Sequence, residues 1–172
     1  MKRSLAQRMG MSGPGDLQRL WAALSRLPGG RRAMSRLVGR AAPYTGTIRA
    51  EILELRAGYA RLAMADRRAV RNHLDCVHAI ALMNLAEETS GLATMMALPP
   101  EARGIIAGLG IDYLKKARGR LEAECSTEVP ALDGRTEHRV EVAIRDAAGD
   151  VVARATARWV IEARRPGPTA RS

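Results

Sequence analysis

The feature that most constrains this 172-residue chain is a run over residues 77–98 that is apolar on nearly every face of a helix. The run carries Glu87 and Glu88 at its middle and stops at Pro99-Pro100. A helix that is apolar all round must be buried on all sides. Two carboxylates at its centre would be costly in a bilayer, so we expect no transmembrane segment here. The chain must therefore supply other elements that surround this helix.

The elements expected around the helix are strands, because apolar and polar residues alternate with a period of two on both sides of it. The phase of this alternation slips after Ile52, where Leu53 and Leu55 are both apolar, and such a slip indicates a β-bulge. The expected strands are residues 47–55, 59–65, 104–116, 118–128, 136–145 and 151–161.

Short turns join the later strands, which predicts antiparallel neighbours. These turns carry Gly119, Asp133-Gly134 and Gly149. One flat sheet face cannot cover a helix that is apolar all round. A curled antiparallel sheet of about six strands would bury it, with a partner subunit covering the rest. The fold class expected is therefore α+β, with one long helix wrapped by the sheet.

The chain divides into three parts by composition. Residues 1–45 form a basic segment with two short amphipathic helices, the first with Asp16 as its expected N-cap. Residues 46–161 hold the sheet and the long helix, and residues 162–172 read as a disordered basic tail. The two helices could dock on the domain, which we prefer, or lie peripherally on an anionic membrane surface.

The formal net charge of +10 does not indicate a nucleic-acid partner. Residues 1–45 hold nine basic residues and one acidic residue, whereas residues 46–161 hold sixteen of each. The excess therefore lies in the ends of the chain. Arginine supplies 25 of the 28 basic residues beside abundant alanine, a bias that fits GC-rich coding as well as phosphate binding.

The cysteine and histidine counts argue against a disulfide-rich protein and against a metal-binding protein. Cys76 and Cys125 are too few for a disulfide scaffold and suit a reducing compartment. With no secretory signal pattern at the start, the expected location is the cytoplasm. The Arg-rich, acid-poor start also resembles an organelle transit peptide, which is the minor alternative. The three histidines and two cysteines show no metal-ligand spacing, so no metal is expected. P-loop and dinucleotide-binding motifs are also missing from the sequence.

Polar side chains gather where the long helix begins. Asn72 and His78 stand at its entry, and Glu87 follows midway along it. The N-terminus of a helix offers unpaired N–H groups and a positive dipole end, which can polarise a carbonyl and hold an oxyanion. A carboxylate facing such a site can attack as a nucleophile or activate water as a general base.

This arrangement resembles a known superfamily. An Asn six residues before a His at the helix entry, with an acid nine residues after the His, is similar to the hotdog-fold acyl-CoA thioesterases of the phenylacetyl-CoA and 4-hydroxybenzoyl-CoA type. The segment from Asn72 to Glu87 resembles most closely a poorly characterised hotdog branch known as a domain of unknown function. Residues 111–117 also resemble the strand that follows the helix in that superfamily. The resemblance covers about residues 45–161 and implies a hotdog fold.

The resemblance also implies roles for single residues. Asn72, His78 and Glu87 match the motif's Asn, His and catalytic acid. The backbone N–H of Ala79 matches the oxyanion-hole position. The thioesterases usually have Gly where this chain has Ala79 and Asp75.

Spacing adds a constraint of its own. Nine helical residues advance about 900°, so His78 and Glu87 lie on roughly opposite faces, about 13 Å apart along the axis. A site that uses both must combine two subunits, as the family does at its dimer interface. Glu88 points elsewhere and is expected to be a rim or partner-paired residue. With Lys115 and Lys116, which could meet coenzyme A phosphates, it is a candidate substrate contact.

The sequence thus predicts a homodimer, or a dimer of dimers, that hydrolyses an acyl-CoA and needs no cofactor beyond its thioester substrate. A hotdog dehydratase is a weaker reading, because its usual His–acid arrangement is missing. A non-catalytic module that senses acyl-CoA or an acyl carrier is the alternative, favoured by Asp75 and Ala79. The sequence favours no particular acyl chain and does not distinguish coenzyme A from a carrier protein as the group that bears it.

Overall fold

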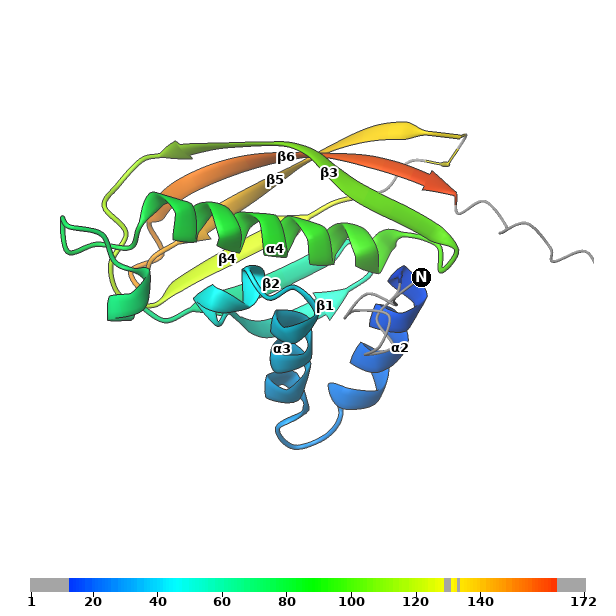
Figure 1. Ribbon diagram of the computed structural model, residues 1–172, viewed down its shortest axis with the longest axis horizontal. Coiled ribbons are helices and arrows are strands. Elements are labelled where there is room, and N and C mark those ends of the chain that lie inside the picture. The colour runs from blue at the N-terminus through cyan, green and yellow to red at the C-terminus, as the bar shows by residue number, and fades with distance from the viewer. Residues whose placement is uncertain (1–12, 129–130, 133, 164–172) are drawn as a thin grey trace, which may run out of the picture.

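The computed structural model describes residues 13–128, 131–132 and 134–163, and helix α4 (Ala79–Ala97) lies at its centre. One antiparallel sheet of six strands, in the order β1-β2-β4-β5-β6-β3, curves around this helix (Figure 1). The predicted α+β architecture is confirmed. The strands are β1 (Glu51–Arg56), β2 (Tyr59–Met64), β3 (Ala102–Tyr113), β4 (Leu121–Ser126), β5 (Thr136–Arg145) and β6 (Val151–Ala163).

The sheet and α4 bury each other through small and aliphatic side chains. Ala86 and Ala93 of α4 are fully buried, and their small size lets the strands approach closely. Alternate residues of β4 and β5 turn inward, as the period of two predicts. A Cβ on Gly91 would lie 3.2 Å from the ring of Trp159, so glycine there lets the indole of β6 pack against α4.

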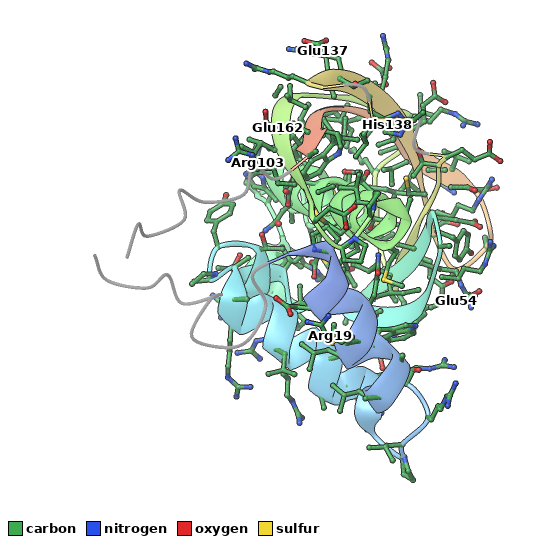
Figure 2. All side chains as sticks on the ribbon, turned by 90° about the vertical axis from the view of Figure 1, so that its right-hand side faces the viewer. Arg19, Glu54, Arg103, Glu137, His138 and Glu162 are labelled. Carbon is green, nitrogen blue, oxygen red and sulfur yellow. The ribbon has the colours of Figure 1, made fainter. Side chains whose placement is uncertain are left out.

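Helices α2 (Pro14–Leu24) and α3 (Gly30–Ala41) pack on the β1 side of α4, opposite β3 (Figure 1). Met34 is 0% exposed, and the indole N–H of Trp21 donates to the carbonyl of Leu55 at 2.8 Å. These side chains join the same apolar core as the sheet. Figure 2 views α4 end on, with charged residues such as Glu54 and Glu137 on the outside.

The chain enters the sheet later than the sequence predicts. Residues Thr45–Ile48 form a short 3-10 helix, η1, and Arg49 follows with a φ of 53°. β1 therefore begins at Glu51, and the expected strand start at residue 47 is wrong, because the alternation continues through this turn without strand geometry. The predicted bulge is confirmed by a register shift between Ile52 and Glu54.

The first helix also begins elsewhere than expected. Its N-cap is Gly13 and its first residue is Pro14, so the prediction of Asp16 as the cap is wrong. Proline suits the first helical position, because its fixed φ is helical and its missing N–H would lack a partner there anyway. Asp16 lies in the first turn instead and pairs with Arg19. A carboxylate in the first turn still complements the helix dipole.

Candidate functional site

The loop that leads into α4 is held by Asn72. Its side-chain Oδ1 accepts a hydrogen bond from the N–H of Leu74 at 2.9 Å, and its own N–H donates to the carbonyl of Cys76 at 2.9 Å. Both bonds stay within residues 72–76, a pattern by which Asn fixes its own turn. Within one chain, Asn72 therefore shapes the entry loop and forms no hydrogen bond with Glu87.

Asp75 occupies a backbone position that favours glycine. Its φ is 52°, in the left-handed region that glycine adopts freely and Asp more readily than most residues. The guanidinium of Arg71 donates to Asp75 Oδ1 at 2.8 Å and to Asp66 Oδ1 at 2.7 Å. The hydrogen bond from Arg71 lowers the pKa of Asp66. The loop thus keeps the path that glycine would allow.

The first turn of α4 leaves one amide without an acceptor. His78 is the N-cap, and its Nδ1 accepts from the N–H of Ile80 at 3.0 Å. This bond assigns the ring proton of neutral His78 to Nε2. The N–H groups of Ala81 and Leu82 both donate to the His78 carbonyl. Among the described residues the N–H of Ala79 has no acceptor, so it is the first-turn donor available to a ligand.

Glu87 lies on a stripe of α4 that neither the sheet nor α3 fully covers. The stripe follows steps of three or four residues, so its members share one face. Burial raises the pKa of the half-buried Glu87 carboxyl, which makes no hydrogen bond or ion pair with another described residue. The carboxyl is therefore an unpaired acid in apolar surroundings. The incompletely buried residues of this stripe are Ile80, Met83, Glu87, Gly91 and Met95.

The stripe runs beside the open edge of the sheet. A Cβ on Gly104 of β3 would lie 3.0 Å from the Met95 methyl group, and the hydroxyl of Tyr113 donates to the carbonyl of Ala79 at 3.1 Å. β3 thus lies near both ends of α4. In the described part of the sheet β3 pairs with β6 alone, so its other edge is unpaired.

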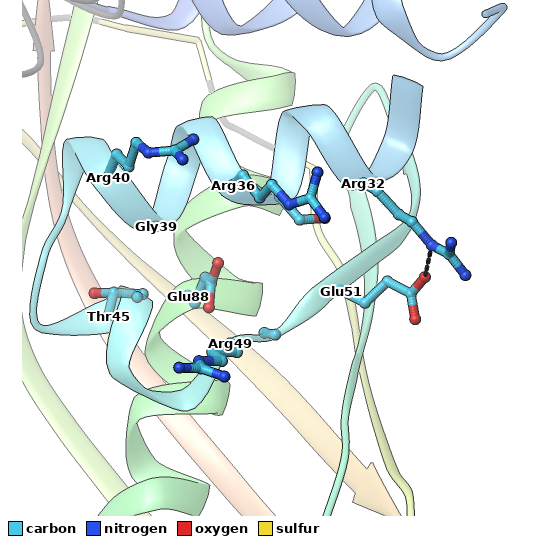
Figure 3. Close-up of a pocket in the computed structure, with 11 residues that line it drawn as sticks. Arg32, Arg36, Gly39, Arg40, Thr45, Arg49, Glu51 and Glu88 are labelled. Atoms are coloured by element: carbon cyan, nitrogen blue, oxygen red, sulfur yellow. Dashed lines mark ion pairs between the residues drawn. The ribbon is translucent and has the colours of Figure 1, made fainter. Parts of the chain in front are cut away.

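Glu88 faces a different side of α4. It is 7% exposed and lines a cavity of about 620 Å³ beneath α3 (Figure 3). Burial, with a smaller contribution from the neighbouring Glu87, raises the pKa of Glu88 to about 8. The sequence predicts a rim or partner-paired residue at this position, whereas the structure places Glu88 under helix α3 of its own chain. Arg32, Arg36 and Arg40 recur at steps of four and so share a helix face, but the sequence did not indicate that this face meets Glu88.

The two lysines proposed for substrate contacts differ in their surroundings. Lys115 Nζ donates to Asp146 Oδ2 at 2.8 Å and to Asp150 Oδ2 at 2.6 Å, and these bonds raise its pKa. Its charge is thus shared with two carboxylates of the turn between β5 and β6. Lys116 is exposed and makes no ion pair within the described residues. Of the two, only Lys116 has its charge unmatched.

Residues 13–128, 131–132 and 134–163 contain no group of three His, Cys, Asp or Glu side chains that could hold a metal ion. In the same ranges, every helix is too short or too polar to span a membrane.

Comparisons with known proteins identify the fold. Residues 30–161 match the model of a domain of unknown function, DUF4442. A structural-genomics crystal structure, APC5556, is 31% identical, covering 86% of this chain and 97% of that one, with a TM-score of 0.73. PA5026 from Pseudomonas aeruginosa, described as a probable thioesterase, is 22% identical and covers 80% and 97%, with a TM-score of 0.70.

A hypothetical thioesterase from Streptococcus pneumoniae, solved with coenzyme A, is 24% identical and covers 68% of this chain and 88% of that one, with a TM-score of 0.57. The comparison with curated proteins found no match. The fold of these neighbours is the curled sheet around one helix described above, as the resemblance implied. The chain therefore belongs to the DUF4442 family, a domain of unknown function, and has the hotdog fold of thioesterase-like proteins.

Proposed function

We propose that this protein hydrolyses acyl-CoA thioesters at a site shared between two copies of the chain. The observation that carries the proposal is the pair of unsatisfied groups on α4. One is the Ala79 N–H, which has no acceptor among the described residues, and the other is the unpaired Glu87 carboxyl. An open N–H at a helix N-terminus and a partly buried acid with a raised pKa are groups that active sites commonly use.

The two groups perform complementary steps. The Ala79 N–H donates to the thioester carbonyl oxygen and holds the oxyanion that forms there. Glu87 takes a proton from water, and the resulting hydroxide adds to the carbonyl carbon. The carbon–sulfur bond then breaks, and the coenzyme A thiolate leaves with the proton that Glu87 held. The pKa of Glu87, raised by burial, makes it a stronger base than an exposed carboxylate.

A second copy of the chain is needed because Ala79 and Glu87 are eight residues apart on one rigid helix, about 12 Å along the axis. The open edge of β3 offers the contact. Ile105 on β3 is 59% exposed and Ile80 on the stripe is 50% exposed, so a partner at this edge would bury both. Glu87 of one chain then faces Ala79 and His78 of the other. Asn72 positions the entry loop, and Lys116 is the better placed of the two lysines for a coenzyme A phosphate.

The test is the release of free thiol from acyl-CoA substrates of increasing chain length. Glu87→Gln should slow turnover by about a hundredfold or more, as expected for loss of a positioned base. Glu141→Gln is the matched control, because Glu141 is an exposed carboxylate on β5. The alternative is a non-catalytic acyl-CoA or acyl-carrier module, which Ala79 favours because its methyl group narrows the approach to the amide. Saturable acyl-CoA binding without turnover at any chain length would establish that alternative.

A further inference from the structure

The cavity beneath α3 lies on another side of α4 from the Glu87 stripe. Helix α3, η1 and the start of β1 form its walls, and Glu88 of α4 forms its floor (Figure 3). At about 620 Å³ it falls within the range of small-molecule sites, roughly 300–1,000 Å³. Its shape depends on a close crossing, because a Cβ on Gly46 would lie 2.3 Å from the carbonyl oxygen of Gly39.

Glu88 is an unsatisfied acid aimed into this cavity. Its side chain is more than nine-tenths buried, and Oε2 has no hydrogen-bond partner among the described residues. A buried polar atom without a partner is destabilising. Because burial favours its protonated form, the carboxyl can donate a hydrogen bond at neutral pH. The floor of the cavity therefore offers a neutral donor.

The walls carry an excess of positive charge. Arg36 and Arg40 lie on one side of Glu88 and Arg49 on the other (Figure 3). Within the described residues none of these three makes an ion pair, whereas Arg32 pairs with Glu51. Arg49 also holds a left-handed backbone conformation, which is unfavourable for a side chain of its size.

The sequence of residues 1–12 contains no acidic residue, and neither does that of residues 164–172. The three arginines are therefore open to an anion from another molecule. A single carboxylate would match one guanidinium, whereas phosphoryl oxygens accept bonds from several at once.

We propose that this cavity binds a small molecule bearing phosphoryl groups, with Arg36, Arg40 and Arg49 holding the phosphoryl oxygens and the buried Glu88 carboxyl contacting the same ligand. This site is separate from the thioester site, because Glu88 and Glu87 face different sides of α4. Free phosphorylated metabolites and phospholipid headgroups share this chemistry.

Inorganic pyrophosphate is the probe that tests the proposal on the full-length protein. Titration calorimetry at pH 7 and constant ionic strength should show saturable binding. Arg36→Gln combined with Arg49→Gln should weaken that binding at least about tenfold, since each removes a charge-assisted bond. Arg31→Gln is the matched control, because Arg31 is exposed on α3 and does not line the cavity. The Arg31→Gln variant should bind pyrophosphate with the same affinity as the unmodified protein.

A second arm distinguishes the two sources of phosphate. Vesicles of phosphatidylcholine with and without phosphatidic acid are sedimented with each variant. Binding of pyrophosphate alone assigns a soluble ligand, and vesicle binding that needs Arg36 and Arg49 but not Arg31 assigns a lipid headgroup. The proposal is overturned if neither probe binds, or if all variants bind equally. Neither probe is a thioester. A failure of the phosphoryl-site proposal therefore does not bear on the proposed thioester hydrolysis.

Discussion

Glu87 and Glu88 are neighbours on α4, yet they occupy separate environments. Glu87 lies half-buried on the stripe beside β3, whereas Glu88 is buried at the floor of the cavity beneath α3. A step of about 100° between consecutive helical residues produces this division. One helix thus presents an acid to each of two sides of the molecule, and substitutions at the two positions should have separable effects.

Replacement of Ala79 by proline should remove the oxyanion donor without disrupting α4. Ala79 is the first residue of the helix, the position that tolerates proline best. His78 has a φ of −64° and a ψ of 140°, which suits a residue before proline. Thioester turnover should fall about a hundredfold or more, while circular dichroism shows a folded chain.

The control for this variant is Ala79→Gly, which keeps the N–H and removes only the methyl group. Its turnover should equal or exceed that of the unmodified protein. Undiminished turnover in a folded Ala79→Pro variant would show that another donor holds the oxyanion.

Replacement of Glu88 by glutamine should stabilise the chain increasingly as the pH rises. In the unfolded chain the carboxyl ionises near its ordinary pKa of 4.5, whereas in the folded chain it stays protonated up to about pH 8. Unfolding therefore releases a proton between these values, and the free energy of unfolding falls as pH rises, by at most about 1.4 kcal/mol per pH unit. Arg36, Arg40 and Arg49 stay charged throughout and cannot cause this slope.

Urea unfolding at pH 5 and pH 8 measures the effect. The Glu88→Gln variant should lose much of the slope that the unmodified protein shows. Glu87→Gln is a necessary comparison, since burial raises the pKa of Glu87 in the same direction. Equal slopes in the unmodified and Glu88→Gln proteins would mean that Glu88 is ionised in the folded state.

Replacement of Met34 by alanine tests how far α3 belongs to the core. Met34 is fully buried against the domain, so its truncation should lower the free energy of unfolding by about 2–5 kcal/mol. Leu27→Ala is the control, because Leu27 is 57% exposed between α2 and α3 and should cost under about 0.5 kcal/mol. Denaturant unfolding of both variants measures these changes in the free energy of unfolding. A Met34→Ala protein as stable as the control would show that α3 detaches without loss of the core.

The sequence predicted the parts of the fold that depend on local pattern. The all-round apolar helix, the six alternating segments and the bulge after Ile52 follow from residue periodicity alone. The start of β1 did not, because η1 forms from residues 45–48 whose alternation also suits a strand. In η1, Ile48 is buried in the core. This packing involves residues far away in the sequence, so a local pattern could not predict it.

The candidate site was predicted in part for a similar reason. The positions of Ala79 and Glu87 on α4 follow from helical spacing and from the family resemblance. The cavity beneath α3 could not be predicted, because it depends on where α3 docks. The four-residue steps of Arg32, Arg36 and Arg40 showed that they share a face, but nothing in the sequence showed that this face meets Glu88.

Under the proposed function, each site combines Glu87 of one chain with Ala79 of the other, so mixing two inactive variants should restore activity. Glu87→Gln and Ala79→Pro are unfolded and refolded together, so that mixed dimers form by random pairing. Each mixed dimer has one site with both lesions and one site with neither. Thiol release should therefore reappear in the mixture, to about a quarter of the unmodified rate, since half of the dimers hold one intact site.

The control is the same mixture combined without unfolding, in which activity should appear only as fast as the dimers exchange chains. Native mass spectrometry identifies the mixed dimers. If they form and remain as inactive as their parents, Glu87 and Ala79 do not meet across the dimer. The separation of about 12 Å on α4 would then exclude joint action of these two groups at one thioester.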